Sequence, residues 1–357
     1  MMIHIITLHS IYNPGSALQA FGLQKFLETE GYDTEIIDYR PRYSTVGRNK
    51  MKGYLRKLLF HNNEVKVKRK YEGFMSEKMK LSQVTYKTFN ELKQAYRNND
   101  IFIAGSDQLW NADYDCGKDD AYYLDFTDST RKIAYATSVG KKSVSEEEIQ
   151  RIIKSIKSFS TITVREKSTA ELLSNRLGEK VTWVCDPVFL LDKDLYDNMT
   201  KKMINNRYAV VYLSSESDLL NNVVEDISKK TGCKIVLIGG NRTRCKCDLH
   251  VRDLGPYDFL SLIKYSEIVI SSSFHATAFA HIFHKKFGVI LPKVNGERIE
   301  SLLELTRLTD RILTDSQSVL SVYKEIDYSK VDMALGRYID ESKKVLLDGV
   351  GNLQDGN

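Results

Sequence analysis

The sequence contains few of the residues that break a chain or cross-link it. Only 5 proline and 20 glycine residues occur among 357, which excludes a linker-rich or fibrous chain. The 5 cysteines are an odd number at irregular spacing, so they predict no disulfide framework and indicate a reducing compartment. No run approaches the ~18–20 apolar residues of a membrane-spanning helix, and the start of the chain lacks the pattern of a signal peptide. We therefore expect a soluble, cytoplasmic protein.

Nucleotide-binding and metal-binding motifs are also missing. No G-x-G-x-x-G motif follows the first predicted strand, and no P-loop lysine motif occurs, which disfavours a dinucleotide-binding enzyme or a P-loop NTPase. Cys245 and Cys247, with His250 nearby, are more closely spaced than the usual cysteine ligands of zinc, and no second pair of ligands is evident. We therefore expect no metal and no cofactor.

Charge is plentiful but unevenly placed. The chain is 42% hydrophobic and 28% charged, a balance that builds globular cores and excludes wholesale disorder. Its formal net charge of +5 is too small for a dedicated nucleic-acid-binding protein, so no nucleic acid partner is expected. Residues 42–80 hold twelve Lys and Arg against three Glu, an excess of +9 that leaves −4 for the rest of the chain. The basic character therefore belongs to one segment.

Short apolar runs alternate with helical periodicity along the chain, which predicts an α/β fold with parallel sheets. The length suits two doubly wound, Rossmann-like domains joined around residues 192–206. We expect an N-terminal domain at 1–191 and a C-terminal domain at 205–325. A final helical segment at 326–357 is expected to pack on the N-terminal domain.

Ligands of parallel α/β sheets bind at the carboxyl ends of the strands, so the loops after the strands are candidate sites. Residues 13–19 open a helix after the first strand, where backbone amides suit anions and hydroxyl oxygens; a plain helix N-cap is the alternative. Residues 105–111 follow a buried strand. In this loop Trp110 offers a flat face for a sugar ring, and Asp107 can accept a proton from a hydroxyl.

Three further junctions carry positive charge or histidine. Arg165 follows a strand, where it can bind a carboxylate or phosphate bidentately or pair with Glu166. Residues 271–277 begin a helix whose free amides suit a phosphate, and His275 in its first turn can transfer a proton near neutral pH. Arg298 stands at a predicted helix start, where a bound anion would offset its repulsion by the helix dipole; an ordinary solvated arginine is the alternative.

Taken in order, these motifs resemble the polysaccharide pyruvyl transferase family. Where the family usually has glycine after the histidine, this chain has Ala276, which would narrow the site slightly. The resemblance spans residues 3 to about 313 and rests on Asn13-x-Gly15-x-Ala17-Leu18-Gln19-Ala20, Ile36-Ile37-Asp38-Tyr39-Arg40-Pro41, Gly105-Ser106-Asp107-Gln108-Leu109-Trp110-Asn111, Tyr123-Leu124-Asp125-Phe126, Tyr135-Ala136-Thr137-Ser138-Val139-Gly140, Val164-Arg165-Glu166, Asp186-Pro187, Ser273-Phe274-His275-Ala276-Thr277-Ala278-Phe279 and Arg298-Ile299-x-Ser301-Leu302-Leu303.

The resemblance implies a GT-B-like pair of domains facing a cleft, with the acceptor on the N-terminal side and the donor on the C-terminal side. Family members transfer pyruvate from phosphoenolpyruvate to two hydroxyls of one sugar, which forms a cyclic ketal and releases phosphate. The implied partners are phosphoenolpyruvate, as co-substrate, and a saccharide acceptor. That acceptor would belong to a bacterial-type surface polysaccharide or exopolysaccharide, or to its lipid-linked precursor.

The resemblance also suggests roles for the candidate residues. His275 is the expected acid, or the donor that neutralises the departing phosphate, and Asp107 is the expected base or the group that orients the acceptor hydroxyls. Arg165 completes the expected catalytic set. The donor is expected to bind Arg165, Ser273, Phe274, His275, Thr277 and Arg298. The acceptor is expected to bind Asn13, Gln19, Ser106, Asp107, Gln108, Trp110 and Asn111.

The basic segment belongs to a helical insertion expected at about 42–98, with one helix near 54–60 and a second at 64–79. Its Lys and Arg, with apolar residues between them, suit peripheral contact with an anionic membrane through residues 48–70. A solvated helical insertion is the alternative.

Two rival functions remain open. A GT-B-type glycosyltransferase would use a sugar nucleotide, for which residues 239–241 are a thin candidate ribose clamp. A non-catalytic saccharide-binding protein would bind sugar without donor turnover.

Overall fold

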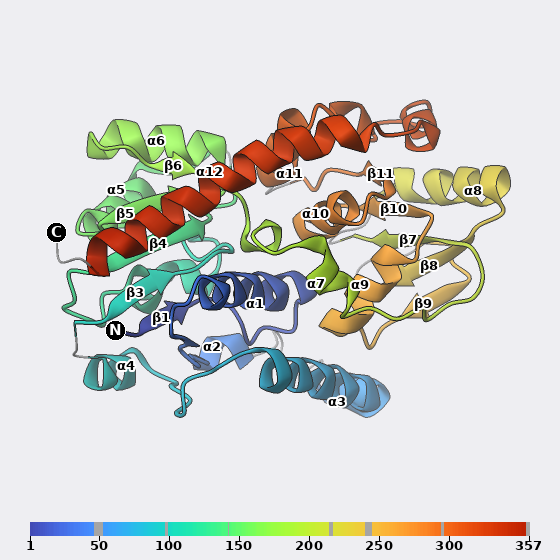
Figure 1. The fold of residues 1–357 in the computed structure, drawn as a ribbon. Coiled ribbons are helices and arrows are strands. Elements are labelled where there is room, and N and C mark those ends of the chain that lie inside the picture. Colours follow the sequence, from blue (N-terminus) through green and yellow to red (C-terminus); the bar gives the residue numbers. More distant parts are fainter. Residues whose placement is uncertain are drawn as a thin grey trace. The chain divides into compact units, whose positions relative to one another are not determined.

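The computed structural model describes residues 1–45, 53–96, 99–141, 143–213, 217–239, 245–293 and 296–354, with the backbone alone at 44–45 and 53–62. The chain divides into two compact units. The first unit contains residues 1–62, 71–191 and 337–357, and the second contains 63–70 and 192–336. Each unit is built around one parallel sheet with helices (Figure 1).

The sheet of the first unit has six strands in the order β2-β1-β3-β4-β5-β6. Reversal of the order at β1 makes it a doubly wound sheet, whose ligands bind at the carboxyl ends of the strands. The strands are β1 (Ile3–Ile6), β2 (Thr34–Ile36), β3 (Ile101–Ala104), β4 (Lys132–Thr137), β5 (Thr161–Val164) and β6 (Thr182–Trp183). The helices are α1 (Pro14–Thr29), α2 (Arg42–Thr45), α3 (Gly53–Lys78), α4 (Phe89–Ala95), α5 (Glu146–Ile156) and α6 (Lys167–Leu177), with short 3-10 turns at Asp115–Lys118, Asp120–Tyr123 and Pro187–Phe189.

The sheet of the second unit has five parallel strands in the order β11-β10-β7-β8-β9. The strands are β7 (Tyr208–Tyr212), β8 (Lys234–Ile238), β9 (Leu249–Val251), β10 (Ile268–Ser271) and β11 (Lys286–Val289). The helices are α7 (Lys193–Asp197), α8 (Leu219–Thr231), α9 (Pro256–Lys264), α10 (Phe274–Ile282) and α11 (Glu297–Leu305), with 3-10 turns at Thr309–Arg311 and Ser318–Tyr323. The last helix, α12 (Tyr328–Gln354), begins in the second unit and continues into the first from residue 337.

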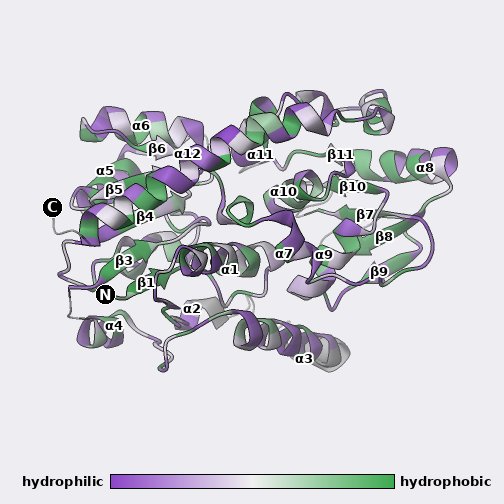
Figure 2. Cartoon of the chain, in the orientation of Figure 1, coloured by the Kyte–Doolittle hydropathy of each residue, from purple (hydrophilic) through white to green (hydrophobic). Residues whose placement is uncertain are grey.

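Burial explains why these segments form strands and helices. Strands such as β1 and β3 are buried along their whole length, as expected for a parallel sheet covered on both faces. Figure 2 shows hydrophobic residues along the strands and mixed faces on helices such as α12. Helix α1 begins with Asn13, whose side-chain oxygen accepts the amides of Gly15 and Ser16, followed by Pro14 in the first turn. This cap starts the helix directly after the first strand.

The basic insertion differs from its prediction. Two helices were expected near 54–60 and 64–79, whereas the backbone forms one continuous helix, α3, over Gly53–Lys78. No helix-breaking residue separates the two stretches, because the chain between them is polar but compatible with a helix. The expected membrane contact at 48–70 falls largely outside the described side chains, since residues 46–52 are not described and only the backbone is described at 53–62. Within the described residues, no helix combines the length and apolarity needed to cross a membrane.

Candidate functional site

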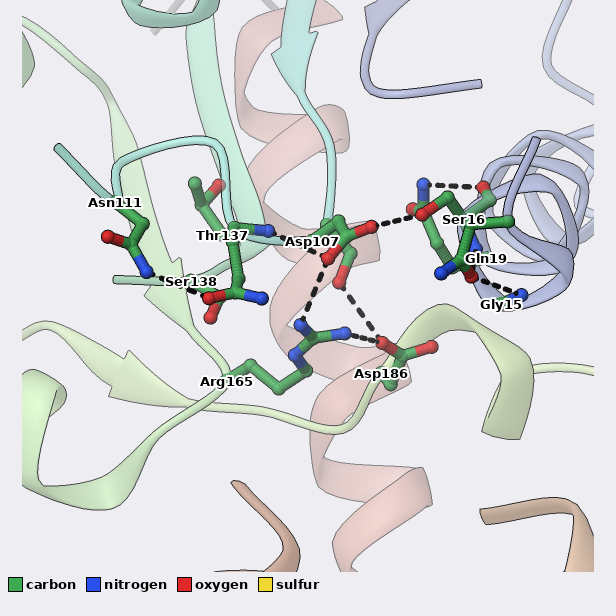
Figure 3. A network of polar contacts seen from close by, with 12 residues as sticks. Gly15, Ser16, Gln19, Asp107, Asn111, Thr137, Ser138, Arg165 and Asp186 are labelled. Carbon is green, nitrogen blue, oxygen red and sulfur yellow. Dashed lines mark hydrogen bonds and ion pairs between the residues drawn. The ribbon is translucent and has the colours of Figure 1, made fainter. Parts of the chain in front are cut away.

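Four polar side chains of the first unit meet where its strands end (Figure 3). The Ser16 hydroxyl, at the start of α1, donates a 2.5 Å hydrogen bond to Oδ2 of Asp107, which follows β3. Arg165, which follows β5, places Nη2 3.6 Å from the other Asp107 oxygen, Oδ1. Its Nη1 pairs with Oδ2 of Asp186, which follows β6. Side chains that follow four different strands of the sheet thus form one network of hydrogen bonds and ion pairs.

Asp107 is held in an uncommon conformation. Its φ of 80° lies in the left-handed region, which aspartate tolerates better than most residues. Its Oδ1 accepts the Gln108 amide at 2.9 Å, in addition to the neighbouring guanidinium. An N–H donor, an O–H donor and a cation therefore stabilise the carboxylate form. Such a carboxylate is better suited to orient a hydroxyl by accepting its hydrogen bond than to remove its proton.

Arg165 is buried among carboxylates, which revises its expected role. Only 3% of the residue is exposed, and its ion pairs within the first unit are with Asp186 and Asp107. Burial alone would lower its pKa, but the charges of Asp186, Asp107 and Glu166 outweigh burial and raise it. The guanidinium is therefore a fixed positive charge that positions Asp107. Bidentate binding of the donor was expected from a strand-end arginine, and these carboxylate pairs instead support a positioning role.

Three residues of the predicted acceptor set make hydrogen bonds that hold the local structure of the first unit. Gln19 is fully buried, and its amide donates 2.9 Å hydrogen bonds to the Thr7 hydroxyl and the Ser16 carbonyl. Ser106 is also fully buried and donates to Asp186 at 3.2 Å. Both predictions of direct acceptor contact are corrected, because both side chains are fully buried and bonded to neighbouring residues. Asn13 is exposed, and its side-chain oxygen caps α1, which is the alternative that the sequence left open.

Trp110 was expected to offer its face to a sugar, and this prediction is wrong. The residue is 1% exposed, and its ring stacks on Tyr123 with the ring centroids 5.9 Å apart. Its indole N–H donates to the Tyr122 carbonyl, so burial leaves no donor unsatisfied. Asn111 is likewise fully buried and donates to the Gln108 side chain at 2.8 Å. Of the predicted acceptor residues Gln108, Trp110 and Asn111, only Gln108 is partly exposed.

Apart from Arg165 in the first unit, the predicted donor residues lie in the second unit, at the start of α10 and, for Arg298, in the first turn of α11. Ser273 caps the helix through its hydroxyl oxygen, which accepts the Ala276 amide at 3.5 Å. The Phe274 and His275 rings lie edge to face, with centroids 5.4 Å apart. The Arg298 guanidinium lies 5.9 Å from the Phe274 ring centroid, within cation–π range. The second unit therefore brings His275 and Arg298 to the same aromatic ring.

Thr277, a further member of the predicted donor set, is turned into its own helix. It is 1% exposed, and its hydroxyl donates to the Ser273 carbonyl one turn earlier at 3.0 Å. The side chain thus satisfies a hydrogen bond within the helix, as threonine commonly does. Its predicted contact with the donor is corrected to a structural role.

Sequence reasoning missed several members of the first-unit cluster. Ser16 and Asp186 lie in recognised motifs but were not expected to be site residues. Glu166, fully buried, accepts a hydrogen bond from the Ser138 hydroxyl. For Ser138, Glu166 and Asp186 the available signal is their position shortly after β4, β5 and β6, whereas Ser16 lies in the first turn of α1, well beyond the end of β1 at Ile6. Among the described residues, no three His, Cys, Asp or Glu side chains are grouped so as to hold a metal ion.

The fold, with two Rossmann-like parallel sheets, is GT-B-like. The chain belongs to the polysaccharide pyruvyl transferase family, whose model matches residues 13–293. It is therefore a transferase of the pyruvyl transferase type. The match includes both clusters except Arg298, which lies beyond its end. No curated protein matches the chain.

Solved structures agree on the fold. The chain is similar to UDP-GlcNAc 2-epimerase from Neisseria meningitidis bound to UDP-GlcNAc, with a TM-score of 0.56, 11% identity, and coverage of 99% of this chain and 100% of that one. It is also similar to MnaA from S. aureus in a structure with UDP, with a TM-score of 0.53, 12% identity, and coverage of 99% and 96%. At these identities the likeness concerns the fold alone.

Proposed function

We propose that this protein transfers pyruvate from phosphoenolpyruvate onto two hydroxyls of one sugar in a surface polysaccharide or its lipid-linked precursor. The observation that carries the proposal is the family match, because it spans the Asp107 cluster and the start of α10 in one alignment. The first unit supplies a fixed carboxylate for hydroxyls, and the second supplies groups suited to an anion. These are the two kinds of recognition that this reaction requires.

The reaction begins with protonation of the methylene carbon of phosphoenolpyruvate, which makes the adjacent carbon electrophilic. One sugar hydroxyl adds to that carbon, and the bond to the phosphate oxygen breaks. The second hydroxyl adds to the same carbon and closes the ketal ring. The two hydroxyl protons are balanced by the proton gained at the methyl group and the proton on the released phosphate. No oxidant, metal or nucleotide enters this balance.

The roles of the residues follow from their chemistry. The amides at the start of α10 and the Arg298 guanidinium suit the phosphate and carboxylate of the donor. His275 supplies the acid, or donates a hydrogen bond to the departing phosphate. Asp107 accepts hydrogen bonds from the acceptor hydroxyls and fixes their approach. Arg165 acts through Asp107, as its positioning residue.

The test is a transfer assay with phosphoenolpyruvate and a panel of glycosides that carry neighbouring free hydroxyls. We expect phosphate release that depends on the acceptor, together with a product heavier by one pyruvate less one water. His275→Gln is expected to lower turnover at least ~100-fold, a typical contribution of acid–base catalysis. His284→Gln is the matched control, because His284 is exposed and pairs with Asp332 at 3.0 Å.

The outcome separates the rival functions. Release of a nucleoside diphosphate from a sugar nucleotide, without phosphate release from phosphoenolpyruvate, would replace the proposal with a glycosyltransferase. Saccharide binding without turnover of either donor would indicate a non-catalytic protein. Near-normal turnover by the His275 variant would refute its assigned role.

A further inference from the structure

The first unit has a surface cavity that the proposed reaction does not use. Its volume is about 580 Å³, within the range of small-molecule sites. Tyr43 and Phe89 contribute aromatic walls, and the 3-10 turns at residues 115–120 contribute the polar ones. The lining residues are Tyr43, Phe89, Asp115, Lys118, Asp119 and Asp120.

The walls of this cavity are fixed before any ligand binds. The hydroxyls of Tyr39 and Tyr43 both donate to Oδ2 of Asp119, at 2.8 and 2.6 Å. The other Asp119 oxygen accepts the Ala121 amide at 3.0 Å. Burial, above all, raises the pKa of Tyr43, so its hydroxyl remains a donor to Asp119. Tyr43 therefore presents a ring held in one position, which lowers the cost of ordering it on binding.

The polar lining selects the chemical class of the ligand. Three carboxylates and one ammonium line the cavity, and Asp120 also pairs with Arg151 at 2.9 Å. The charges at the cavity still sum to a negative value, so a phosphate or carboxylate ligand such as phosphoenolpyruvate would be repelled. Lys118 in turn disfavours a bare metal cation. A neutral ligand with many hydroxyls can donate to the exposed Asp115 carboxylate and accept from the Lys118 ammonium, while its C–H faces pack on the aromatic rings. These are the properties of a sugar.

The cavity wall is built on the same loop as Asp107. This loop begins after β3 ends at Ala104, passes through Asp107 and reaches the cavity at Asp115. Cys116 donates from its thiol to the Gln108 carbonyl at 3.4 Å. Gly117 packs so closely on Asn111 that an added Cβ would lie 2.1 Å from the Asn111 carbonyl oxygen. The loop therefore joins the carboxylate and the cavity rigidly.

We propose that this cavity is a saccharide subsite, which binds a sugar unit of the acceptor other than the one that is modified. The inference rests on the proposed function and extends it, since it makes an oligosaccharide or polymer, and not a single sugar, the preferred acceptor. Asp107 orients the reacting unit, and the ring faces of Tyr43 and Phe89 hold a further unit of the same chain.

Direct binding tests the subsite without requiring turnover. Calorimetric titration with trisaccharides of glucose, of galactose and of mannose is carried out on the full chain and on two variants. Phe89→Leu keeps the apolar volume but removes the aromatic face, and Asp115→Ala removes an exposed carboxylate of the cavity. Each variant is expected to bind the preferred trisaccharide roughly threefold to tenfold more weakly, as loss of one ring contact or hydrogen bond would.

Asp113→Ala is the matched control for the carboxylate. Asp113 is also exposed and lies two residues away, but it pairs with Lys141 at 3.0 Å and does not line the cavity. This variant is expected to bind like the unaltered chain. Equal affinity of all variants, or no binding of any trisaccharide to the unaltered chain, refutes the proposal of a subsite.

Kinetics separates this inference from the proposed function. If phosphate is released, a second sugar on the acceptor is expected to raise kcat/KM, and Phe89→Leu is expected to remove that gain while keeping the rate with a single sugar. Transfer that is indifferent to acceptor length refutes the subsite and leaves the reaction intact. Binding of a trisaccharide without any pyruvate transfer refutes the proposed reaction and leaves the proposal of a subsite standing.

Discussion

Two arginines of the first unit allow a matched test of what holds the site together. Arg165 pairs with Asp186 in the interior, where both side chains are at most 2% exposed. Arg176 pairs with Glu146 on the surface, at 2.7 Å, with side-chain exposures of 41% and 58%. Both are ion pairs between an arginine and a carboxylate, so burial is the main difference between them.

Replacing each arginine by methionine keeps most of the side-chain volume and removes the charge. Arg165→Met takes the guanidinium away from Asp186 and Asp107, whose side chains remain buried, and we expect a loss of about 3–5 kcal/mol of unfolding free energy. Arg176→Met removes a solvent-exposed pair, for which the expected loss is about 0–1 kcal/mol. Raising the salt concentration is expected to reduce only the second effect, because buried pairs are screened much less.

The chain itself provides the probe. Its 2 tryptophans, Trp110 and Trp183, both lie in the first unit, so their fluorescence during urea unfolding follows that unit. Trp183 also donates its indole N–H to the Arg165 carbonyl at 3.2 Å, close to the substitution.

A double-mutant cycle completes the comparison. Combining Arg165→Met with Asp186→Asn is expected to cost less than the two single changes added together, with a coupling of about 0.5–3 kcal/mol. The equivalent cycle at Arg176 and Glu146 is expected to give a coupling near zero. If Arg165→Met costs no more than Arg176→Met, the buried network does not stabilise the site and the reasoning fails.

Three further predictions concern packing and pH. Gly22→Ala is expected to destabilise the first unit strongly, because the new Cβ would lie 2.6 Å from the Pro187 carbonyl oxygen. At Gly73 an added Cβ meets no atom within 4 Å, so Gly73→Ala should stabilise its helix by about 0.5–1 kcal/mol. Urea unfolding measures both effects. Burial raises the pKa of Asp38, but hydrogen bonds from three neighbouring side chains outweigh it and hold this pKa well below its usual range. Stability from Asp38 is thus present above about pH 3.9 and lost as the pH falls further, and Asp38→Asn should flatten that acid loss in denaturation curves. Burial lowers the pKa of His281 to about 4. As the pH falls from about 6.5 to 4, the histidine of the unfolded chain gains a proton and that of the folded chain does not, so the free energy of unfolding should fall by up to ~1.4 kcal/mol per pH unit. His281→Gln should remove this slope in unfolding curves measured by circular dichroism.

Much of the fold could be predicted because buried parallel strands are continuous apolar runs. The sequence predicts strands at residues 101–104, 161–164 and 234–238, and β3, β5 and β8 have these same bounds. Strand β9 was missed, since Leu249–Val251 contains a histidine, lies between Asp248 and Arg252, and forms the edge of its sheet. An edge strand need not be apolar, so its sequence carries a weaker signal.

The site was harder to predict than the fold because its contacts join distant parts of the chain. The position of Asp107 after a strand marked it as a candidate, but its hydrogen bond to Ser16 spans 91 residues, and no local pattern encodes that pairing. Trp110 illustrates the opposite error. Its residue type suggested a sugar platform, whereas the direction of its ring depends on packing against Tyr123, which only the folded chain determines.

The backbone of Asp107 links stability to function at this site. A left-handed conformation costs an L-residue roughly 1–2 kcal/mol, although aspartate tolerates it better than most residues. Glycine would adopt the same φ without that cost, but it would remove the carboxylate that Ser16 and Arg165 hold in place. The surrounding network therefore stabilises a conformation that the residue would not adopt alone, as observed where strained residues serve function. This argues that the carboxylate itself, and not the turn it occupies, is what this chain retains at residue 107.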